Sequence, residues 1–258
     1  PLCNAVSRGE LGGYRQLEIA RILLEGGADP NIPATCGYTP LAMSAHDTKL
    51  FDLLIEHGAY PSPDHPMELF VALYSFNKDV VSALLEMDLD CNKTALSDAQ
   101  PHWHTHRFQK VPVNSGLILS PLLYISMLPF NESNSRDHAC KMIRFLLERG
   151  ADPFLPCDAN ELVLHQIFAS GGIIQPWLEM PNLDLTRRDP KGRTLLLAAA
   201  SCATGTESYA CTVSAYPLRG GQLGPVSWKE GDPTRAMTLF ERGADLSAID
   251  YDNNNVLH

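Results

Sequence analysis

A short segment recurs along the chain about every 31 residues, and this periodicity limits the fold more than any single motif does. In each copy a run of apolar residues ends in glutamate, and the glutamates lie at positions 25, 56, 86, 148, 179 and 241. Successive intervals are therefore 31, 30, 62, 31 and 62 residues. A unit of this length is too small to bury its own apolar side, so it must stack on its neighbours. The periodicity predicts an array of stacked helical hairpins.

Signals for the ends of helices recur with the same spacing. A glycine follows the apolar run in several copies, and glycine can adopt the left-handed conformation that ends a helix without a Cβ clash. Upstream, Thr39-Pro40 and Ser120-Pro121 place a capping hydroxyl before a proline, which suits the first position of a helix. Each unit is thus expected to hold two short helices. The glycines that follow the runs are Gly27, Gly58, Gly150 and Gly243.

The start and stop segments together resemble the ankyrin repeat family, whose units open with Gly-x-Thr-Pro-Leu-His and close with Gly-Ala-Asp-x-Asn. Residues 37–41 read Gly-Tyr-Thr-Pro-Leu, and residues 27–31 read Gly-Ala-Asp-Pro-Asn. The resemblance implies an all-α fold, an α-solenoid of helix-turn-helix repeats that forms a single array over residues 1–258. We expect a diverged array cut from a longer protein. Its six units are expected at about 1–32, 33–65, 66–92, 117–155, 156–188 and 189–250, with the start of a further unit at 251–258.

The two 62-residue intervals hold either degenerate repeats in phase or insertions. Residues 93–116 lack the apolar run and stop signal at the expected place, and residues 203–232 are rich in glycine and proline. We therefore interpret both segments as loop insertions, and loops of that length in compact domains are often functional or mobile. Within the fourth unit, we expect Leu147 to be buried at the seam between repeats.

The net charge limits the classes of partner that the chain can bind, and the cysteines indicate the cellular compartment. The chain has 20 basic and 30 acidic residues, for a formal net charge of -10, which disfavours nucleic-acid binding. No apolar run approaches the roughly 18 residues that cross a bilayer, so no membrane contact is expected. The seven cysteines form no Cys-x-x-Cys pair, which favours reduced thiols in the cytoplasm or nucleus.

The function class that follows is a non-catalytic protein-binding module, the recognition segment of a larger protein. Stacked repeats expose an extended surface, whereas catalysis needs groups that converge in a pocket. No nucleophile-elbow, P-loop or zinc-protease motif is present, so we expect no enzyme activity and no cofactor. The alternative is a metal-dependent or hydrolytic site built by the insertions around His102, His104 and His106, with Cys91 as a further ligand. A purely structural spacer is a third possibility.

The predicted partner surface lies at the turns between units. The family resemblance implies that turn tips are exposed, which places Tyr38, Tyr251 and a cluster of four cations near one edge. Aromatic and arginine side chains are frequent energetic anchors of interfaces, and the cations favour a partner protein or peptide that is acidic. His165 stands where the family has its motif histidine, which implies a structural hydrogen bond near a turn. The four cations are Arg187, Arg188, Lys191 and Arg193.

Overall fold

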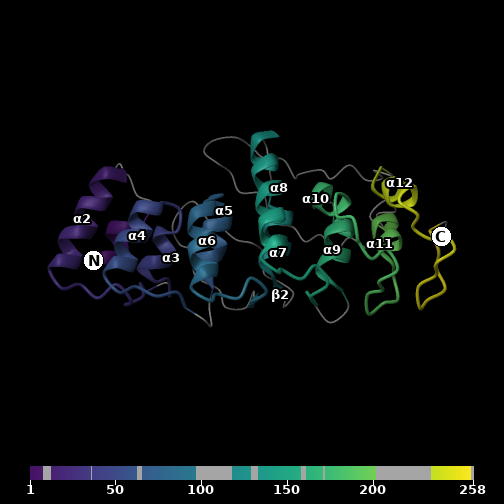
Figure 1. Cartoon of the computed structure of the whole chain (residues 1–258). Coiled ribbons are helices and arrows are strands. Elements are labelled where there is room, and N and C mark those ends of the chain that lie inside the picture. Colours follow the sequence, from purple (N-terminus) through teal and green to yellow (C-terminus); the bar gives the residue numbers. More distant parts are fainter. Residues whose placement is uncertain are drawn as a thin grey trace, which may run out of the picture. The chain divides into compact units, whose positions relative to one another are not determined.

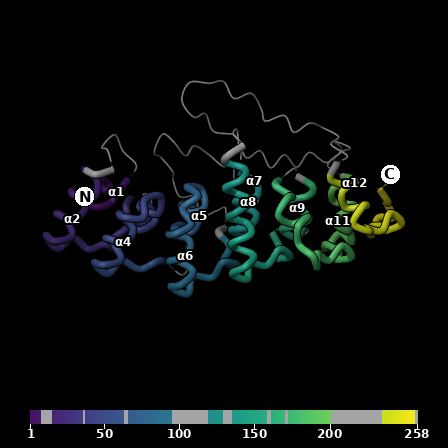
Figure 2. The backbone as a smooth tube through the Cα atoms, turned by 45° about the horizontal axis from the view of Figure 1, so that its top comes forward, coloured from purple at the N-terminus to yellow at the C-terminus, as the bar shows by residue number. Residues whose placement is uncertain are grey.

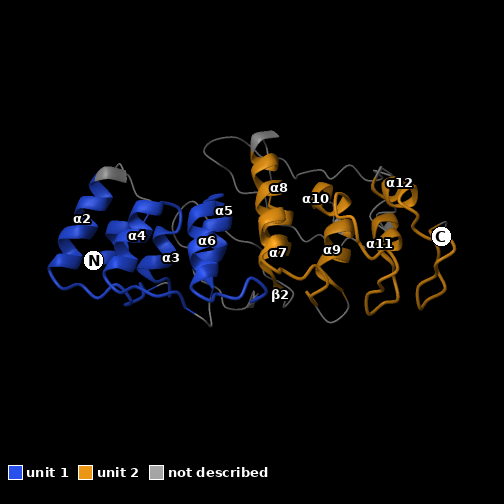
Figure 3. Ribbon diagram, in the orientation of Figure 1, with its two compact units in different colours: residues 1–95, 99–106 blue, residues 96–98, 107–258 orange. Residues whose placement is uncertain are grey.

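The computed structural model forms two compact units, each described by itself below (Figure 3). The first unit comprises the described residues up to 95, and the second comprises those from 96 onward. The division falls inside the first expected insertion, most of which lies outside the described residues, as does all of the second insertion. The structure describes residues 1–7, 13–35, 37–62, 66–96, 118–128, 133–157, 161–170, 172–201 and 234–256.

In the first unit, helices form three successive hairpins, each within one expected repeat (Figures 1 and 2). The first helix of each hairpin packs on the first helix of the next, and the second helices stack in the same way. The hairpins are α1 (Leu2–Val6) with α2 (Gly13–Glu25), α3 (Pro40–Ser44) with α4 (Thr48–Glu56), and α5 (Met67–Tyr74) with α6 (Lys78–Glu86). A two-residue strand, β1 (Ala95–Leu96), follows.

The second unit repeats the pattern. Along its row of first helices, α9 packs against both α7 and α11, while α10 packs on α8 and α12 on α11. The helix α10 is four residues long, so this repeat has a reduced second helix. The elements are β2 (Ile118–Leu119), α7 (Pro121–Met127), α8 (Ser133–Glu148), α9 (Val163–Ser170), α10 (Gln175–Leu178), α11 (Leu195–Ser201) and α12 (Thr234–Glu241).

The predicted signals for helix ends are confirmed. The hydroxyls of Thr39 and Ser120 accept hydrogen bonds from backbone N–H groups three residues on, at 3.1 and 3.2 Å, ahead of prolines that open α3 and α7. In the third repeat, which lacks a glycine, Asp88 takes the left-handed conformation with φ of 61°. The stop glycines Gly27, Gly58, Gly150 and Gly243 all have φ between 83° and 90°.

The segment after each second helix turns in the same way in most repeats. An aspartate accepts a hydrogen bond from the backbone N–H two residues on, at 2.8 to 2.9 Å, which is an Asx turn. This turn directs the chain away from the helix and toward the connection that leads to the next repeat. The aspartates are Asp29, Asp90, Asp152, Asp184 and Asp245.

The apolar core follows the helix seams, with one correction to the sequence analysis. Leu69 and Leu196, on the first helices α5 and α11, are at most 1% exposed. On α8, however, Leu146 is fully buried together with Ile143, three residues before it, whereas Leu147 is only half-buried. The expectation for Leu147 is wrong because the buried face of α8 passes through positions 143 and 146, and the next residue lies to the side of it.

Candidate functional site

The connections between repeats contain a recurring five-residue turn, called a tip here. The backbone N–H of its first residue donates to the carbonyl of its fifth residue. This bond joins Ala34 to Tyr38 at 2.8 Å, Cys157 to Glu161 at 3.1 Å, Asp189 to Arg193 at 3.0 Å and Asp250 to Asn254 at 3.0 Å. The last three tips lie in the second unit.

The most elaborate of these turns is the tip at residues 189–193, and together with Arg187 and Arg188 before it, it is called the basic tip here (residues 187–193). The buried carboxylate of Asp189 accepts hydrogen bonds from the N–H groups of Lys191 and Arg193, at 3.0 and 2.8 Å. The N–H of Gly192 donates to the carbonyl of Asp189 at 2.8 Å, and Gly192 has a φ of 79°, which favours glycine. One aspartate therefore organises the whole turn.

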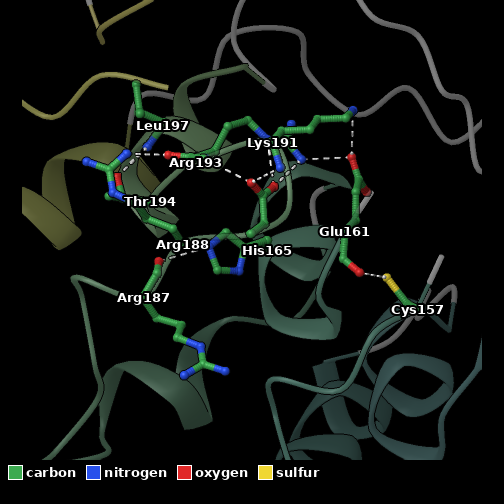
Figure 4. A network of polar contacts seen from close by, with 11 residues as sticks. Cys157, Glu161, His165, Arg187, Arg188, Lys191, Arg193, Thr194 and Leu197 are labelled. Carbon is green, nitrogen blue, oxygen red and sulfur yellow. Dashed lines mark hydrogen bonds and ion pairs between the residues drawn. The ribbon is translucent and has the colours of Figure 1, made fainter. Parts of the chain in front are cut away.

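A buried ion-pair network holds the basic tip to the preceding repeat (Figure 4). The Arg193 guanidinium lies 2.8 Å from both the Asp189 and Glu161 carboxylates, and these side chains are 10%, 0% and 11% exposed. The Lys191 ammonium lies 3.4 Å from the same Glu161 oxygen. Burial alone would lower the pKa of Arg193, but the two carboxylates raise it above its ordinary value. A guanidinium that is always charged thus bridges two buried carboxylates, and the Lys191 ammonium supplies the second positive charge.

His165 on α9 is fully buried beside this network, and its ring points toward the backbone of Arg187 (Figure 4). A carbonyl can only accept, so the Nε2–H group of His165 donates to the Arg187 oxygen, at 3.2 Å. This bond is the structural hydrogen bond that the family resemblance implied. Burial lowers the pKa of His165, and the Asp189 carboxylate opposes that effect in part.

Two neighbouring tips of the second unit are tied together. The second is the Tyr251 tip, residues 250–254, which follows Ile249. The guanidinium of Arg188 donates to the carbonyls of both Gly192 and Ile249, and the N–H of Tyr251 donates to the Lys191 carbonyl at 3.2 Å. The Tyr251 ring lies on Gly192 so closely that a Cβ there would come within 2.6 Å of a ring carbon. Tyr251 nevertheless remains 72% exposed.

Comparison with solved structures places this arrangement of helices and tips among known folds. The chain is similar to the human ASB11 ankyrin repeat domain, with a TM-score of 0.61 and 14% identity over 100% of this chain and 90% of that one. It is also similar to the ankyrin repeat domain of Bcl-3, with a TM-score of 0.52 and 19% identity over 77% of each chain. The fold is an all-α solenoid of the ankyrin type. No family model and no curated protein sequence matches the chain.

The ankyrin-type fold brings five of the six predicted partner residues together. Arg187, Arg188 and Tyr251 are exposed at the two tips, and Lys191 is partly buried against Glu161. The expectation of exposure is wrong for Arg193, which is 8% exposed, and for Tyr38, which is 5% exposed and belongs to the first unit. Both are the fifth residue of a tip, where the chain turns inward to begin a first helix.

Sequence reasoning missed the partners of these cations. Glu161 and Arg193 are the fifth residues of consecutive tips, 32 positions apart, and carry opposite charges. Aligning the repeats by their tips would have indicated this contact. The cation–π contact of Arg187, whose guanidinium lies 5.5 Å from the Phe154 ring centre, had no comparable signal.

The alternative metal site rests on His102, His104 and His106, which lie outside the described residues. Within the described ranges, no group of three histidine, cysteine or acidic side chains is placed to hold a metal ion. Burial, followed by the nearby Asp90 charge, raises the pKa of the Cys91 thiol, which disfavours the thiolate that zinc would need. No helix among the described residues is both long and apolar enough to cross a membrane.

Proposed function

We propose that the chain is a non-catalytic module that binds another protein through the basic tip and the Tyr251 tip. The observation that carries this proposal is the placement of Tyr251, which is 72% exposed yet held on Gly192 by ring contact and a backbone hydrogen bond. Exposed tyrosine and arginine side chains are typical energetic anchors of protein interfaces.

The two tips form a surface that is ordered before a partner arrives. Arg188 joins the backbone of the basic tip to that of Ile249, just before the Tyr251 tip, and Asp189 fixes the turn from inside. Binding to a preorganised surface loses less conformational entropy than binding to loops that must be ordered first. This rigidity supports recognition by the tips.

The chemistry of the partner can be inferred from which cations of the basic tip already form ion pairs with carboxylates of this chain. In the described part of the chain, Arg193 and Lys191 form ion pairs with Glu161. Arg187 and Arg188 are exposed, form no ion pair with a described carboxylate, and contact an aromatic ring and backbone carbonyls, although their charges help to lower the pKa values of Asp184 and Asp245. We therefore assign the acidic groups of a partner to Arg187 and Arg188, and an apolar group to Tyr251. The net charge of -10 supports a protein partner over a nucleic acid.

Site-specific photocrosslinking tests this surface. A photoreactive amino acid would replace Tyr251 in one sample and Tyr60 in another, because Tyr60 is 63% exposed but lies in the first unit. We expect a protein that crosslinks from position 251 and not from position 60. If both positions capture the same proteins, or position 251 captures none, the proposed surface is wrong.

The charge assignment has its own test on the captured partner. Arg188→Gln removes the charge but keeps an amide group that can donate to backbone carbonyls. Arg187→Gln removes the charge at the neighbouring position. Together they should slow association about tenfold at low salt and much less at high salt, because steering by exposed charges is screened. Stopped-flow association rates measure this. An unchanged rate at low salt would leave the protein-binding proposal standing but remove the acidic contact.

A further inference from the structure

The ring of His165 lies where a change of charge would reach the basic tip directly. Its Nε2–H group donates to the carbonyl of Arg187, the first residue of that tip. Its Nδ1 atom is buried and has no hydrogen-bond partner among the described residues. The corresponding positions in other described repeats, four residues after the fifth residue of a tip, hold Ala42 and Leu197.

We infer that His165 makes the basic tip sensitive to mild acid, so that protonation of its ring loosens residues 187–193 while the rest of the fold is unaffected. The two carboxylates of Glu161 and Asp189 already face two cations, Arg193 and Lys191, so a protonated His165 would add a third positive charge beside a pair that is already balanced. The inference goes beyond the proposed function, since it concerns the tip itself and requires no partner.

The groups that face His165 act in both directions. The Asp189 carboxylate and the backbone of Arg187 and Arg193 favour the protonated ring, whereas burial and the Arg193 guanidinium oppose it. Helices α7 and α11 pack against α9, and Tyr124 on α7 is the only ionisable residue on those two helices. Arg235 on α12 also contacts α9, since it donates to the carbonyls of Ile167 and Phe168. Burial outweighs the favourable groups, and the pKa of His165 is lowered.

The direction of the pH effect follows from this balance. An unfolded or locally opened His165 has the ordinary pKa of about 6.5 and takes up a proton before the buried ring does. The stabilisation of the closed tip is therefore complete above about pH 6.5 and is lost as the pH falls from there toward the lowered pKa of the closed state. At pH 5, opening should become more frequent by up to about thirtyfold, the limit that is reached if the closed ring stays neutral.

Amide hydrogen exchange, corrected for intrinsic rates, tests the inference in the whole chain between pH 7.5 and pH 5. This range lies above the values near 4 at which carboxyl groups ordinarily titrate. The readout is the N–H groups of Asp189, Gly192 and Arg193, which the tip holds in hydrogen bonds. The N–H groups of Ala34 and Gly37 belong to a tip of the same backbone pattern in the first unit and provide the internal reference.

We expect protection of the basic tip to fall at pH 5, by up to about thirtyfold, and that of the reference tip to stay the same. In His165→Gln, an amide N–H can still reach the Arg187 carbonyl but cannot titrate, so the fall should disappear. The matched control His138→Gln removes an exposed histidine on α8 and should leave the fall intact. An equal loss of protection in both tips, or a loss that persists in His165→Gln, would overturn the inference.

A direct titration keeps the inference testable if His165→Gln does not fold. In the unaltered chain, the carbon-bound ring proton of His165 reports its protonation by NMR. We expect that signal to titrate at a lower pH than the signal of an exposed histidine, whose pKa is about 6.5. Titration of His165 at or above pH 6.5 would show that protonation costs nothing in the folded state, and the inference would then be wrong.

Acid sensitivity of the tip would also affect a bound partner. This step rests on the proposed function. A partner held by the two tips should dissociate faster at pH 5, and His165→Gln should abolish the change. If exchange shows the opening but the partner's dissociation rate does not change with pH, the acid-sensitive tip stands and the proposed contact surface fails.

Discussion

The tip at residues 34–38 in the first unit and the tip at 189–193 in the second share one backbone and differ in chemistry. In both, the first N–H donates to the fifth carbonyl, and the fourth residue is a glycine with φ of 84° or 79°. The fifth residue is buried in both, but it is Tyr38 in one and Arg193 in the other. The two tips thus have the same backbone pattern because they belong to the same kind of repeat. We infer that the buried side chain at the fifth position sets how strongly a tip binds the neighbouring repeat.

The largest expected effect comes from removing the buried cation. Arg193→Met leaves the Glu161 and Asp189 carboxylates buried without their main partner, so it should lower the free energy of unfolding by about 3–5 kcal/mol. Denaturant unfolding followed by circular dichroism measures this. At the same position in the first unit, Tyr38→Phe removes no charge and should cost well under about 1 kcal/mol.

A double variant sharpens this result. Adding Glu161→Gln to Arg193→Met removes one of the two buried carboxylates that lost the guanidinium, so it should recover part of the lost stability. If Arg193→Met and Tyr38→Phe lower the free energy of unfolding equally, then the buried ion pair does not stabilise the contact between repeats. The chemical difference between the two tips would then have no effect on stability.

The two glycines give the next largest effect. No described atom lies within 4 Å of a Cβ placed at Gly37, whereas a Cβ at Gly192 would collide with the Tyr251 ring. Gly37→Ala should therefore cost only the left-handed strain, about 1–2 kcal/mol. Gly192→Ala should cost about 1 kcal/mol more, because the ring must move. Unfolding free energies of the two variants measure the difference.

The excess cost at Gly192 should vanish when the ring is removed. In the background Tyr251→Ala, the substitution Gly192→Ala should cost about the same as Gly37→Ala, because only the backbone strain remains. An excess that survives in the Tyr251→Ala background would mean that the ring does not rest on Gly192 in solution.

The features that sequence predicted are those set by local backbone chemistry. Helix starts at Thr39-Pro40 and Ser120-Pro121, and the glycine stops, depend on a few adjacent residues and were confirmed. The fold class followed because these signals recur with one period. The buried face of α8 was placed one residue too far along, because adjacent leucines at 146 and 147 do not show which of them faces the neighbouring repeat.

The features that sequence missed depend on contacts between repeats. Tyr38 and Arg193 are a ring and a cation at a turn, a pattern that indicates exposure when a turn is considered alone. Their burial follows from the preceding or following repeat, and for Arg193 it follows from Glu161, 32 residues away. The contact of the Tyr251 ring with Gly192 likewise joins residues that are 59 positions apart in the sequence. The sequence analysis was wrong about the exposure of Tyr38 and Arg193, and the binding of a partner by Arg187, Arg188, Lys191 and Tyr251 stays a prediction.

The smallest expected effect comes from the Tyr251 tip, which lacks the glycine. It tests whether this tip has the same backbone conformation as the other two. Asn253 occupies the fourth position of the Tyr251 tip, with φ of 63°, where Gly37 and Gly192 stand in the other two. Glycine adopts this conformation with less strain than asparagine, although it loses more entropy on folding, so Asn253→Gly should stabilise the chain by about 0.5 kcal/mol. Asn255→Gly, the same change two residues on, lies where φ is not positive and should destabilise by a similar amount. Thermal unfolding of the two variants side by side measures both shifts. Two shifts of the same sign would contradict the view that this tip and the basic tip share one backbone conformation.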